Sequence, residues 1–287
     1  MSAPDTLQVP DILEVEDLAV DHGVGRKRKR AVNGVSFSIP TGSTLGLVGE
    51  SGSGKTTTGM AILGMLPIAS GRVLFEGRDI TAIPRGEQRA LGARRQVIFQ
   101  DPYSSLDPTK TIGYTLAEPC RIAARADRMS AAQIAERQAM LLQRVGLSPD
   151  AARRYPAQFS GGQRQRIAIA RALMLSPRLI VCDEPVSALD LSVQAEVLNL
   201  LVELQRDLGL SLLFISHDLS VVRHISHSIV VLRNGAVVEQ GPAGRVYDEP
   251  ADQYTRSLLA AAPVPDPAEQ QARRDERHRR RMEDDSR

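Results

Sequence analysis

Aromatic side chains are scarce in this sequence of 287 residues: it contains no tryptophan, and its aromatic residues make up 3% of the total. A protein that reads nucleic acid by stacking bases needs such side chains, so their scarcity argues against that function. An excess of one charge is also lacking, because 36 basic residues nearly cancel 34 acidic ones and leave a formal net charge of +2. No global field would draw such a chain onto nucleic acid or anionic lipid, and we expect no nucleic-acid partner.

Cysteines and long apolar runs are lacking too. Cys120 and Cys182 lie in unrelated contexts without metal-ligand spacing, which excludes a disulfide framework, a zinc site and an iron–sulfur cluster. The most apolar window, residues 197–215, is interrupted by charged side chains such as Glu203 and Asp207, and the N-terminus lacks the pattern of a signal peptide. The sequence therefore predicts no membrane span and favours a reducing, cytosolic location.

Short apolar runs that alternate with helical patterns dominate what is present. The runs cover residues 45–48, 97–99, 179–182 and 212–215. Continuous apolar strands separated by helices indicate a sheet covered on both faces, so the predicted fold class is α/β. The expected helices include residues 57–66 and 131–145.

Other segments predict additions to this α/β core. Residues 12–20 and 35–39 are typical of antiparallel strands, and residues 228–239, with a central Asn-Gly pair, are typical of a hairpin. Between about residues 101 and 176 the pattern is helical, which predicts a helical subdomain inserted between strands. After Gly241 we expect a short helical turn and an amphipathic segment over residues 254–262.

The strongest motif matches G-x-x-x-x-G-K-[ST] between a predicted strand and a predicted helix. Its glycines let successive backbone N–H groups point inward around an anion, and the helix N-terminus adds partial positive charge. Lys55 is expected to reach the β- and γ-phosphates of a nucleotide, and the Thr56 hydroxyl to ligate Mg²⁺. The alternative is a glycine-rich turn with a chance lysine. The residues of this phosphate loop are Gly49, Glu50, Ser51, Gly52, Ser53, Gly54, Lys55, Thr56 and Thr57.

Two carboxylates, Asp183 and Glu184, end the predicted strand over residues 179–182. Adjacent side chains on a strand point in different directions, so the two acids are expected to have different roles. Asp183 would organise Mg²⁺, and Glu184 would orient and polarise an attacking water. The alternative is a strand that ends in two solvated acids.

A second anion-binding device is predicted at the start of the helix over residues 164–175. Ser160 is a good N-cap, and Gly161 and Gly162, followed by Gln163, leave the first N–H groups of the helix uncovered. By physics alone, an ordinary capped helix explains the segment equally well.

Taken together, these segments resemble the ATP-binding subunits of ABC transporters over roughly residues 12–241. The signature segment of that family resembles residues 159–163 here. By the same resemblance, Gln100 corresponds to the Q-loop glutamine that touches Mg²⁺ or water, Asp190 lies in the D-loop at the dimer seam, and His217 corresponds to the switch histidine that bonds the γ-phosphate.

The resemblance implies a head-to-tail dimer with ATP between the phosphate loop of one chain and Ser160–Gln163 of the other. Mg²⁺ would be held by Thr56, Gln100 and Asp183, and catalysis would rest on Glu184, His217 and Gln100. Such a subunit lies on the cytoplasmic face of the membrane, as a peripheral partner of two permease subunits and an extracytoplasmic solute-binding protein. The rival functions are a soluble ABC ATPase acting on DNA or ribosomes, and a nucleotide or protein kinase, which would leave the signature segment unexplained.

Further segments resemble the oligopeptide/dipeptide (peptide/nickel) permease subgroup, and within it the second of two paired ATPase subunits, which implies a heterodimer. They are residues 99–108, residues 184–201 and residues 252–259. The last differs from the subgroup, since Asp252-Gln253 replaces the usual His-Pro. The resemblance implies peptides as cargo, with nickel, glutathione-like compounds and other small solutes as alternatives. We expect an ABC-type domain over residues 1–245, a permease-type extension over 246–267 and a disordered tail over 268–287.

The region ahead of the phosphate loop departs from the family in its adenine contact. Relatives present an aromatic ring there, and this chain offers only His22. His22 is expected to stack on adenine; the alternative is a solvated loop histidine. The basic run at residues 26–30 is interpreted as a mobile solvated loop, with attraction of phosphate or lipid headgroups as the alternative.

Overall fold

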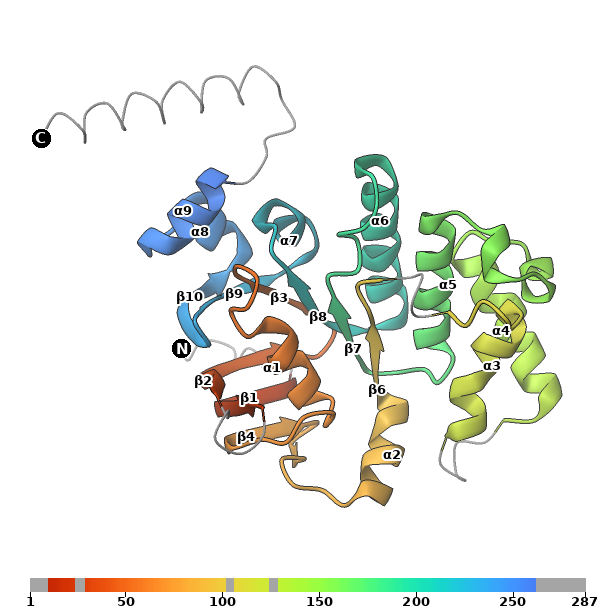
Figure 1. Ribbon diagram of the computed structural model, residues 1–287, viewed down its shortest axis with the longest axis horizontal. Helices are drawn as coiled ribbons and strands as arrows, with labels where there is room; N and C mark the ends of the chain where they lie inside the picture. Colours follow the sequence, from red (N-terminus) through yellow and green to blue (C-terminus); the bar gives the residue numbers. More distant parts are fainter. Residues whose placement is uncertain (1–9, 24–28, 102–105, 124–128, 262–287) are drawn as a thin grey trace, which may run out of the picture.

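A mixed six-stranded sheet forms the centre of the molecule (Figure 1). The structure is a computed structural model, and it describes residues 10–23, 29–101, 106–123 and 129–261. The strand order is β10-β9-β3-β8-β7-β6, parallel from β9 to β6, with β10 antiparallel at one edge. The strands are β3 (Thr44–Val48), β6 (Arg95–Ile98), β7 (Leu179–Asp183), β8 (Ser211–Ser216), β9 (Ser228–Arg233) and β10 (Ala236–Pro242).

Side chains along the central strands alternate between two hydrophobic cores. In β8, Leu212 and Phe214 lie in one core, and Leu213 and Ile215 lie in the other. All four are fully buried, as expected for a strand covered on both faces. The predicted α/β class is confirmed. Cys182 is buried in the first core as a free thiol, and burial raises its pKa.

A second, antiparallel sheet packs over one face of the first. Its order is β2-β1-β4-β5, formed by β1 (Asp11–His22), β2 (Lys29–Pro40), β4 (Ser70–Phe75) and β5 (Arg78–Asp79). The predicted pair over residues 12–20 and 35–39 is confirmed, although both strands are longer than expected. Between the two sheets lies α1 (Lys55–Ile62), which contacts β1 and β2 on one side and β7 and β8 on the other.

Helix α1 is shorter than the predicted span of residues 57–66. It begins at Lys55, directly after Gly54, and ends at Ile62. Gly64 then takes a positive φ of 73°, a left-handed conformation that stops a helix. The early start places the lysine of the phosphate loop in the first turn of α1.

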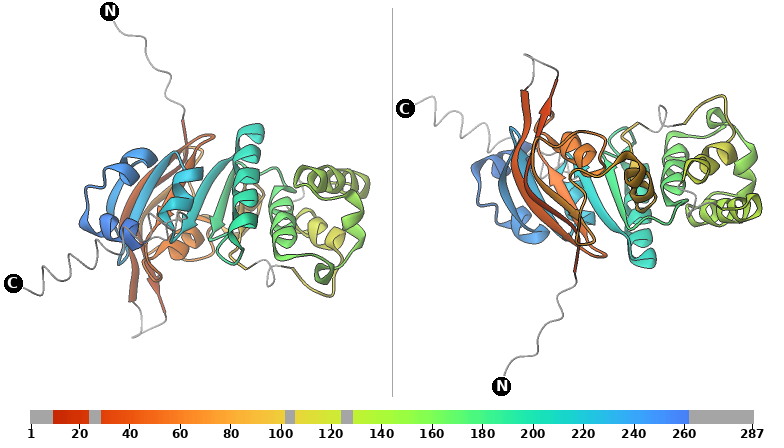
Figure 2. Two further views of the ribbon diagram at one scale, coloured as in Figure 1. Left: turned by 90° about the horizontal axis from the view of Figure 1, so that it is seen from above. Right: turned by 90° about the horizontal axis from the view of Figure 1, so that it is seen from below.

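Helices alone fill the described residues between β6 and β7, as predicted for the inserted block. They are α3 (Ile112–Ile122), α4 (Ala131–Arg144), two 3₁₀ turns (Pro149–Arg153 and Pro156–Gln158) and α5 (Gly161–Leu173). Figure 2 shows this block at one end of the molecule, with α8 (Ala243–Asp248) and α9 (Gln253–Ala261) at the other. The remaining helices are α2 (Arg85–Arg94), α6 (Leu191–Leu208) and α7 (Leu219–Ile225). Among the helices that the structure describes, none combines the length and apolar composition needed to cross a bilayer.

The predicted hairpin is confirmed as β9 and β10. Asn234 and Gly235 have φ values of 51° and 81°, and two positive φ angles at the centre of a two-residue turn define type I′. The amphipathic segment predicted at residues 254–262 is α9, which packs against α7 and β10. The tail predicted for residues 268–287 lies outside the described residues.

Candidate functional site

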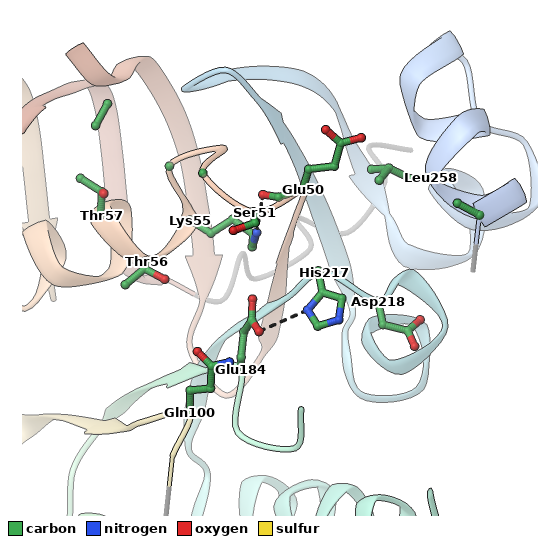
Figure 3. Close-up of a pocket in the computed structure, with 14 residues that line it drawn as sticks. Glu50, Ser51, Lys55, Thr56, Thr57, Gln100, Glu184, His217, Asp218 and Leu258 are labelled. Carbon is green, nitrogen blue, oxygen red and sulfur yellow. Dashed lines mark hydrogen bonds and ion pairs between the residues drawn. The ribbon is translucent and has the colours of Figure 1, made fainter. Parts of the chain in front are cut away.

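A cavity of about 740 Å³ opens at the carboxyl ends of the parallel strands (Figure 3). Open α/β sheets bind ligands at this edge. The loop after β3, the residues after β6, β7 and β8, and α9 all contribute to its wall. The lining residues are Ala31, Glu50, Ser51, Gly52, Gly54, Lys55, Thr56, Thr57, Gln100, Glu184, His217, Asp218, Leu258 and Ala261.

The phosphate loop keeps its shape because glycine stands where another residue would clash. Gly49 and Gly54 have φ values of 154° and 104°. A Cβ on Gly49 would lie 2.2 Å from the Leu232 carbonyl oxygen, and one on Gly54 would lie 2.7 Å from that of Ala31. The hairpin turn braces the loop, since the Gly235 N–H donates to the carbonyl of Ser53 over 2.9 Å. The two glycines and this brace fix the backbone path of the loop ahead of α1.

Lys55 lies within the curl of this loop and is only 4% exposed. Its ammonium donates to the carbonyl oxygens of Gly49 and Glu50 over 2.7 and 2.8 Å. Burial lowers the pKa of Lys55, and the carboxylates of Glu184, Asp183 and Glu50 oppose that shift. These surrounding carboxylates favour the ammonium form, which is the form that attracts phosphate.

Thr56 and Asp183 form an oxygen pair beside Lys55. The Thr56 hydroxyl donates to Asp183 Oδ1 over 2.9 Å, and Asp183 is 7% exposed. Burial raises the pKa of this carboxyl, and the hydrogen bond from Thr56 opposes the shift. Hydroxyl and carboxylate oxygens are Mg²⁺ ligands, and Mg²⁺ usually takes one or two from the protein and others from phosphate. The pair fits that ion, and the described residues contain no cluster of three or more His, Cys, Asp or Glu side chains that would hold a metal unaided.

Glu184 turns into the cavity where β7 ends. It has a positive φ of 47°, which is uncommon for a residue with a side chain, and its N–H donates to the Ile215 carbonyl over 3.0 Å. Its carboxylate Oε2 lies 3.2 Å from Nδ1 of His217 (Figure 3). Gln100 lies beside Glu184 in the cavity wall, as Figure 3 shows. The structure thus brings together the three residues predicted for catalysis.

The signature segment lies outside this cavity. Ser160 and Gln163 form a reciprocal cap: Ser160 Oγ accepts from the Gln163 N–H over 3.3 Å, and Gln163 Oε1 accepts from the Ser160 N–H over 3.1 Å. Both residues are exposed, Gly161 is half-buried and Gly162 is buried at the start of α5. Within this chain, the N-terminus of α5 does not line the nucleotide cavity.

Asp190 is likewise exposed and outside the cavity. It caps α6, because its Oδ1 accepts from the Val193 N–H over 3.0 Å and from the Ser192 hydroxyl over 2.8 Å. These hydrogen bonds lower the pKa of Asp190. An exposed cap ahead of α6 is compatible with a contact to another molecule.

His22 is the last residue of β1, opposite Lys29 of β2, and it is exposed. It does not line the cavity; the residue of β2 that lines the cavity is Ala31. The loop interpretation of the basic run is wrong for Lys29 and Arg30, which continue β2; Arg30 pairs with Asp21 over 2.6 Å. Pairing with β1 extends the strand beyond its apolar residues. Residues 26–28 of the run lie outside the described residues.

The part of the cavity wall that comes from α9 is not predicted by any motif in the sequence. Leu258 and Ala261 line the cavity, and Tyr254 of the same helix contacts the phosphate loop. The segment was singled out by its resemblance to a subgroup of permease ATPases, which carried no indication of contact with the nucleotide site. Asp218, next to His217, also lines the cavity and caps α7.

A phosphate loop at the start of a helix, a buried strand that ends in Asp-Glu, and an antiparallel sheet beside a mixed one define a P-loop ATPase of the ABC type. The comparisons agree with this class. A family model described as ABC transporter matches residues 32–187, and the chain belongs to the ABC transporter family.

Curated relatives match over most of this chain. The glutathione import ATP-binding proteins GsiA of Escherichia coli (strain K12) and Salmonella typhimurium are each 51% identical to it over 244 residues. The alignments cover 85% of this chain, and the chain spans 39% of the length of each relative.

Solved structures share the fold. The ATP-binding cassette MJ0796, in a dimeric post-hydrolysis state bound to ADP and Pi, is 27% identical with a TM-score of 0.71, covering 80% of this chain and 98% of that one. The protein cbiO1 from Clostridium perfringens, part of the ABC transporter complex cbiONQ, is 27% identical with a TM-score of 0.72, covering 83% and 91%.

Proposed function

We propose that this chain is the ATP-binding and ATP-hydrolysing motor subunit of an ABC importer. One observation carries the proposal. Lys55, Thr56 and Glu184 line one cavity, and Asp183 is hydrogen-bonded to Thr56, whereas the signature segment, with Ser160 and Gln163 exposed, lies outside the cavity. A motor that works by closing a dimer needs a site whose two parts lie on different subunits.

Lys55 and the N–H groups of the phosphate loop bind the β- and γ-phosphates of ATP. The ammonium now held by two loop carbonyls is placed to neutralise phosphate charge, which is already present in the ground state. Thr56 and Asp183, with Gln100, would hold Mg²⁺. When bound, this ion would supply positive charge that offsets the charge of the phosphates.

Glu184 orients the attacking water and accepts hydrogen bonds from it. His217, 3.2 Å from Glu184, lies where it can contact the γ-phosphate and keep the carboxylate in position. Gln100 contributes an amide to the same part of the cavity. Glu184 acts only on the attacking water, so its removal affects hydrolysis more than binding.

A second ABC ATPase subunit completes the site in head-to-tail fashion. Ser160, Gly161, Gly162 and Gln163 of this chain would face the phosphates bound by that subunit, its signature segment would face the phosphates bound here, and Asp190 would lie at the seam. The resemblance to paired subunits favours a heterodimer. The dimeric state of MJ0796 bound to ADP and Pi supports this arrangement.

The chain has an apolar groove of about 500 Å³ between β6, α2, α3 and α5. This groove supports the proposal of a membrane partner. Its wall includes Met65, Phe99 and Ile122, whose side chains are 54%, 37% and 66% exposed. Phe99 precedes Gln100, which lines the nucleotide cavity. We assign this groove to a helix of a permease subunit, because a shift there would reach Gln100 through the adjoining backbone.

The cargo is proposed to be oligopeptides or dipeptides, including peptides of the glutathione type. The relatives named as glutathione import proteins support this class. Nickel and other small solutes are the alternatives. In the full assembly, two permease subunits and an extracytoplasmic solute-binding protein join the ATPase pair at the cytoplasmic face of the membrane, and this chain is peripheral.

The same proposal divides the chain by role. Residues 1–245 form the ABC-type domain, with the helical subdomain at about 101–176. Residues 246–267 form the permease-type extension, which includes the end of α8 and the whole of α9. The interval 268–287 would be a tail.

Co-purification with permease subunits tests the function most directly. The chain is co-expressed with candidate permease subunits, solubilised in mild detergent and captured by a tag. We expect both permease subunits in the eluate, with Met65→Glu reducing their recovery and Met140→Glu leaving it unchanged. Met140 is a matched control, since it is 43% exposed on α4 and does not line the groove. Recovery of ribosomal or DNA partners in place of permeases would contradict the importer function.

A further inference from the structure

Helix α9 is fixed to the body of the protein at its N-terminal end. The carboxylate of Glu239, on β10, accepts from the N–H groups of Ala251 and Asp252 over 2.8 and 3.1 Å. Asp252 Oδ1 accepts from the Tyr254 N–H over 2.7 Å and caps the first turn. The entry into α9 therefore has a defined position relative to β10, which sets where Tyr254 stands.

Tyr254 reaches from this helix to the phosphate loop, 204 residues away in sequence. It is 7% exposed, and its phenolic oxygen accepts a hydrogen bond from the Glu50 N–H over 3.0 Å. The guanidinium of Arg233 lies 4.8 Å from the centre of its ring. The Arg233 guanidinium therefore lies against the ring, and the hydroxyl hydrogen-bonds to the phosphate loop.

The N–H of Glu50 and the carbonyl of Gly49 belong to one peptide group. Lys55 Nζ donates to the oxygen of that group over 2.7 Å, and Tyr254 holds its N–H over 3.0 Å. Glycine at position 49 leaves this peptide free to rotate, as it lacks the Cβ that restricts other residues. Two contacts from opposite sides therefore hold one orientation, and the carbonyl so oriented is one of two that locate the Lys55 ammonium.

We propose that Tyr254 is a positioning residue of the phosphate site. By holding the Gly49–Glu50 peptide, it keeps Lys55 and the loop in the arrangement that receives the phosphates, and α9 becomes part of the nucleotide site. Leu258 and Ala261, farther along α9, continue the wall of the same cavity. The inference rests on the proposed binding of ATP at this site.

Tyr254→Phe tests the role, because it removes only the hydroxyl and keeps the packed ring. Tyr247→Phe is the matched control. Tyr247 lies on α8, with the Arg223 guanidinium 4.3 Å from its ring, and it does not line the cavity. ATP, ADP and inorganic pyrophosphate are titrated against the three full-length proteins, and thermal unfolding is followed without nucleotide.

We expect Tyr254→Phe to raise the dissociation constants of all three ligands about fivefold, the effect of one neutral hydrogen bond of about 1 kcal/mol. Tyr247→Phe should bind like the wild type. If Tyr254→Phe lowers the unfolding temperature and leaves all three constants unchanged, its role is structural and the inference is overturned while the proposed function stands. If the wild-type chain binds none of the three ligands, the proposed function fails and the inference falls with it.

Discussion

The N-termini of α1 and α5, both proposed to bind phosphate, differ in how much of their surroundings this chain supplies. The N-terminus of α1 is enclosed: Lys55 is buried, Thr56 is bonded to Asp183, and Glu184 and His217 lie across the cavity. The N-terminus of α5 is open, with exposed Ser160 capped only by its own helix.

This difference separates a contact made within one molecule from one made between two. Under the proposed function, the pocket around α1 would let the isolated chain bind the phosphates. The open end of α5 would contact a phosphate only when a second molecule brings one to it. Single substitutions at the enclosed end have the largest expected effects.

Lys55→Ala and Glu184→Gln are expected to fail in different ways. The first removes the cation that neutralises ground-state phosphate charge, so ATP affinity falls by about a hundredfold or more. The second removes the carboxylate that acts on water, so affinity is kept and turnover falls by about 10²–10⁴-fold. ATP titration and single-turnover hydrolysis separate the two outcomes. Glu184→Gln should also stabilise the ATP-closed dimer, and its hydrolysis at the wild-type rate would remove Glu184 from the mechanism.

Ser160→Ala is expected to lower turnover without weakening ATP binding by the isolated chain. A hydrogen bond to a charged group is worth about 1.5–3 kcal/mol, so loss of this contact across a dimer should slow hydrolysis about 10- to 100-fold. Ser130→Ala is the control, because Ser130 and Gln133 form the same reciprocal cap on α4. Both variants lose one cap, costing about 1 kcal/mol of stability, which thermal unfolding reports. Equal turnover in both would argue against a signature role.

Asp183→Asn is expected to remove the Mg²⁺ dependence of ATP binding without destabilising the chain. Burial raises the pKa of Asp183 above its unfolded value, so the ionised carboxylate opposes folding at neutral pH, and that penalty disappears as the pH falls through the folded pKa. Asparagine keeps an acceptor for Thr56 and removes the buried charge. The unfolding temperature without nucleotide at pH 7 should equal or exceed that of the wild type. A clear decrease would show that the ionised form stabilises the fold.

His22→Ala is expected to have the smallest effect, a few-fold to about tenfold rise in the ATP dissociation constant. Stacking on a base is worth about 1–3 kcal/mol for aromatic rings, and imidazole lies at or below the lower end. His22→Tyr should tighten binding, and replacing residues 26–30 by Ser and Gly should act mainly through a salt-dependent term. Titrations of the three variants with ATP at two salt concentrations separate the stacking effect from the salt-dependent effect. Unchanged affinity in both His22 variants would leave it an ordinary exposed histidine.

Contacts between neighbours in sequence were predictable, because each rests on local chemistry. The strand before Gly49, the hairpin turn at Asn234-Gly235 and the cap at Ser160 follow from the residues at those positions. Helix α2 was missed because its sequence is rich in arginine and has a weak apolar pattern, and β4 was missed because pairing with β1 defines it.

Contacts over long sequence distances were not predictable from local patterns. The Tyr254 hydroxyl meets the Glu50 N–H only because β10 and Glu239 place α9 over the phosphate loop. The resemblance indicates that His22 faces adenine, and this contact stays a prediction; pairing of β1 with β2 places His22 at a strand end, opposite Lys29. The motif residues of the site were therefore easier to predict than the residues of α9 that complete the cavity wall.

The concentration dependence of ATP hydrolysis tests the shared site most directly. Specific activity of the purified chain is measured over a wide range of concentration, with the oligomeric state followed in the same samples, and then with increasing amounts of the second ATPase subunit. We predict poor hydrolysis at low concentration, with activity rising faster than in proportion to chain concentration as dimers form or partner is added. A constant specific activity in a preparation shown to be monomeric would contradict the shared site.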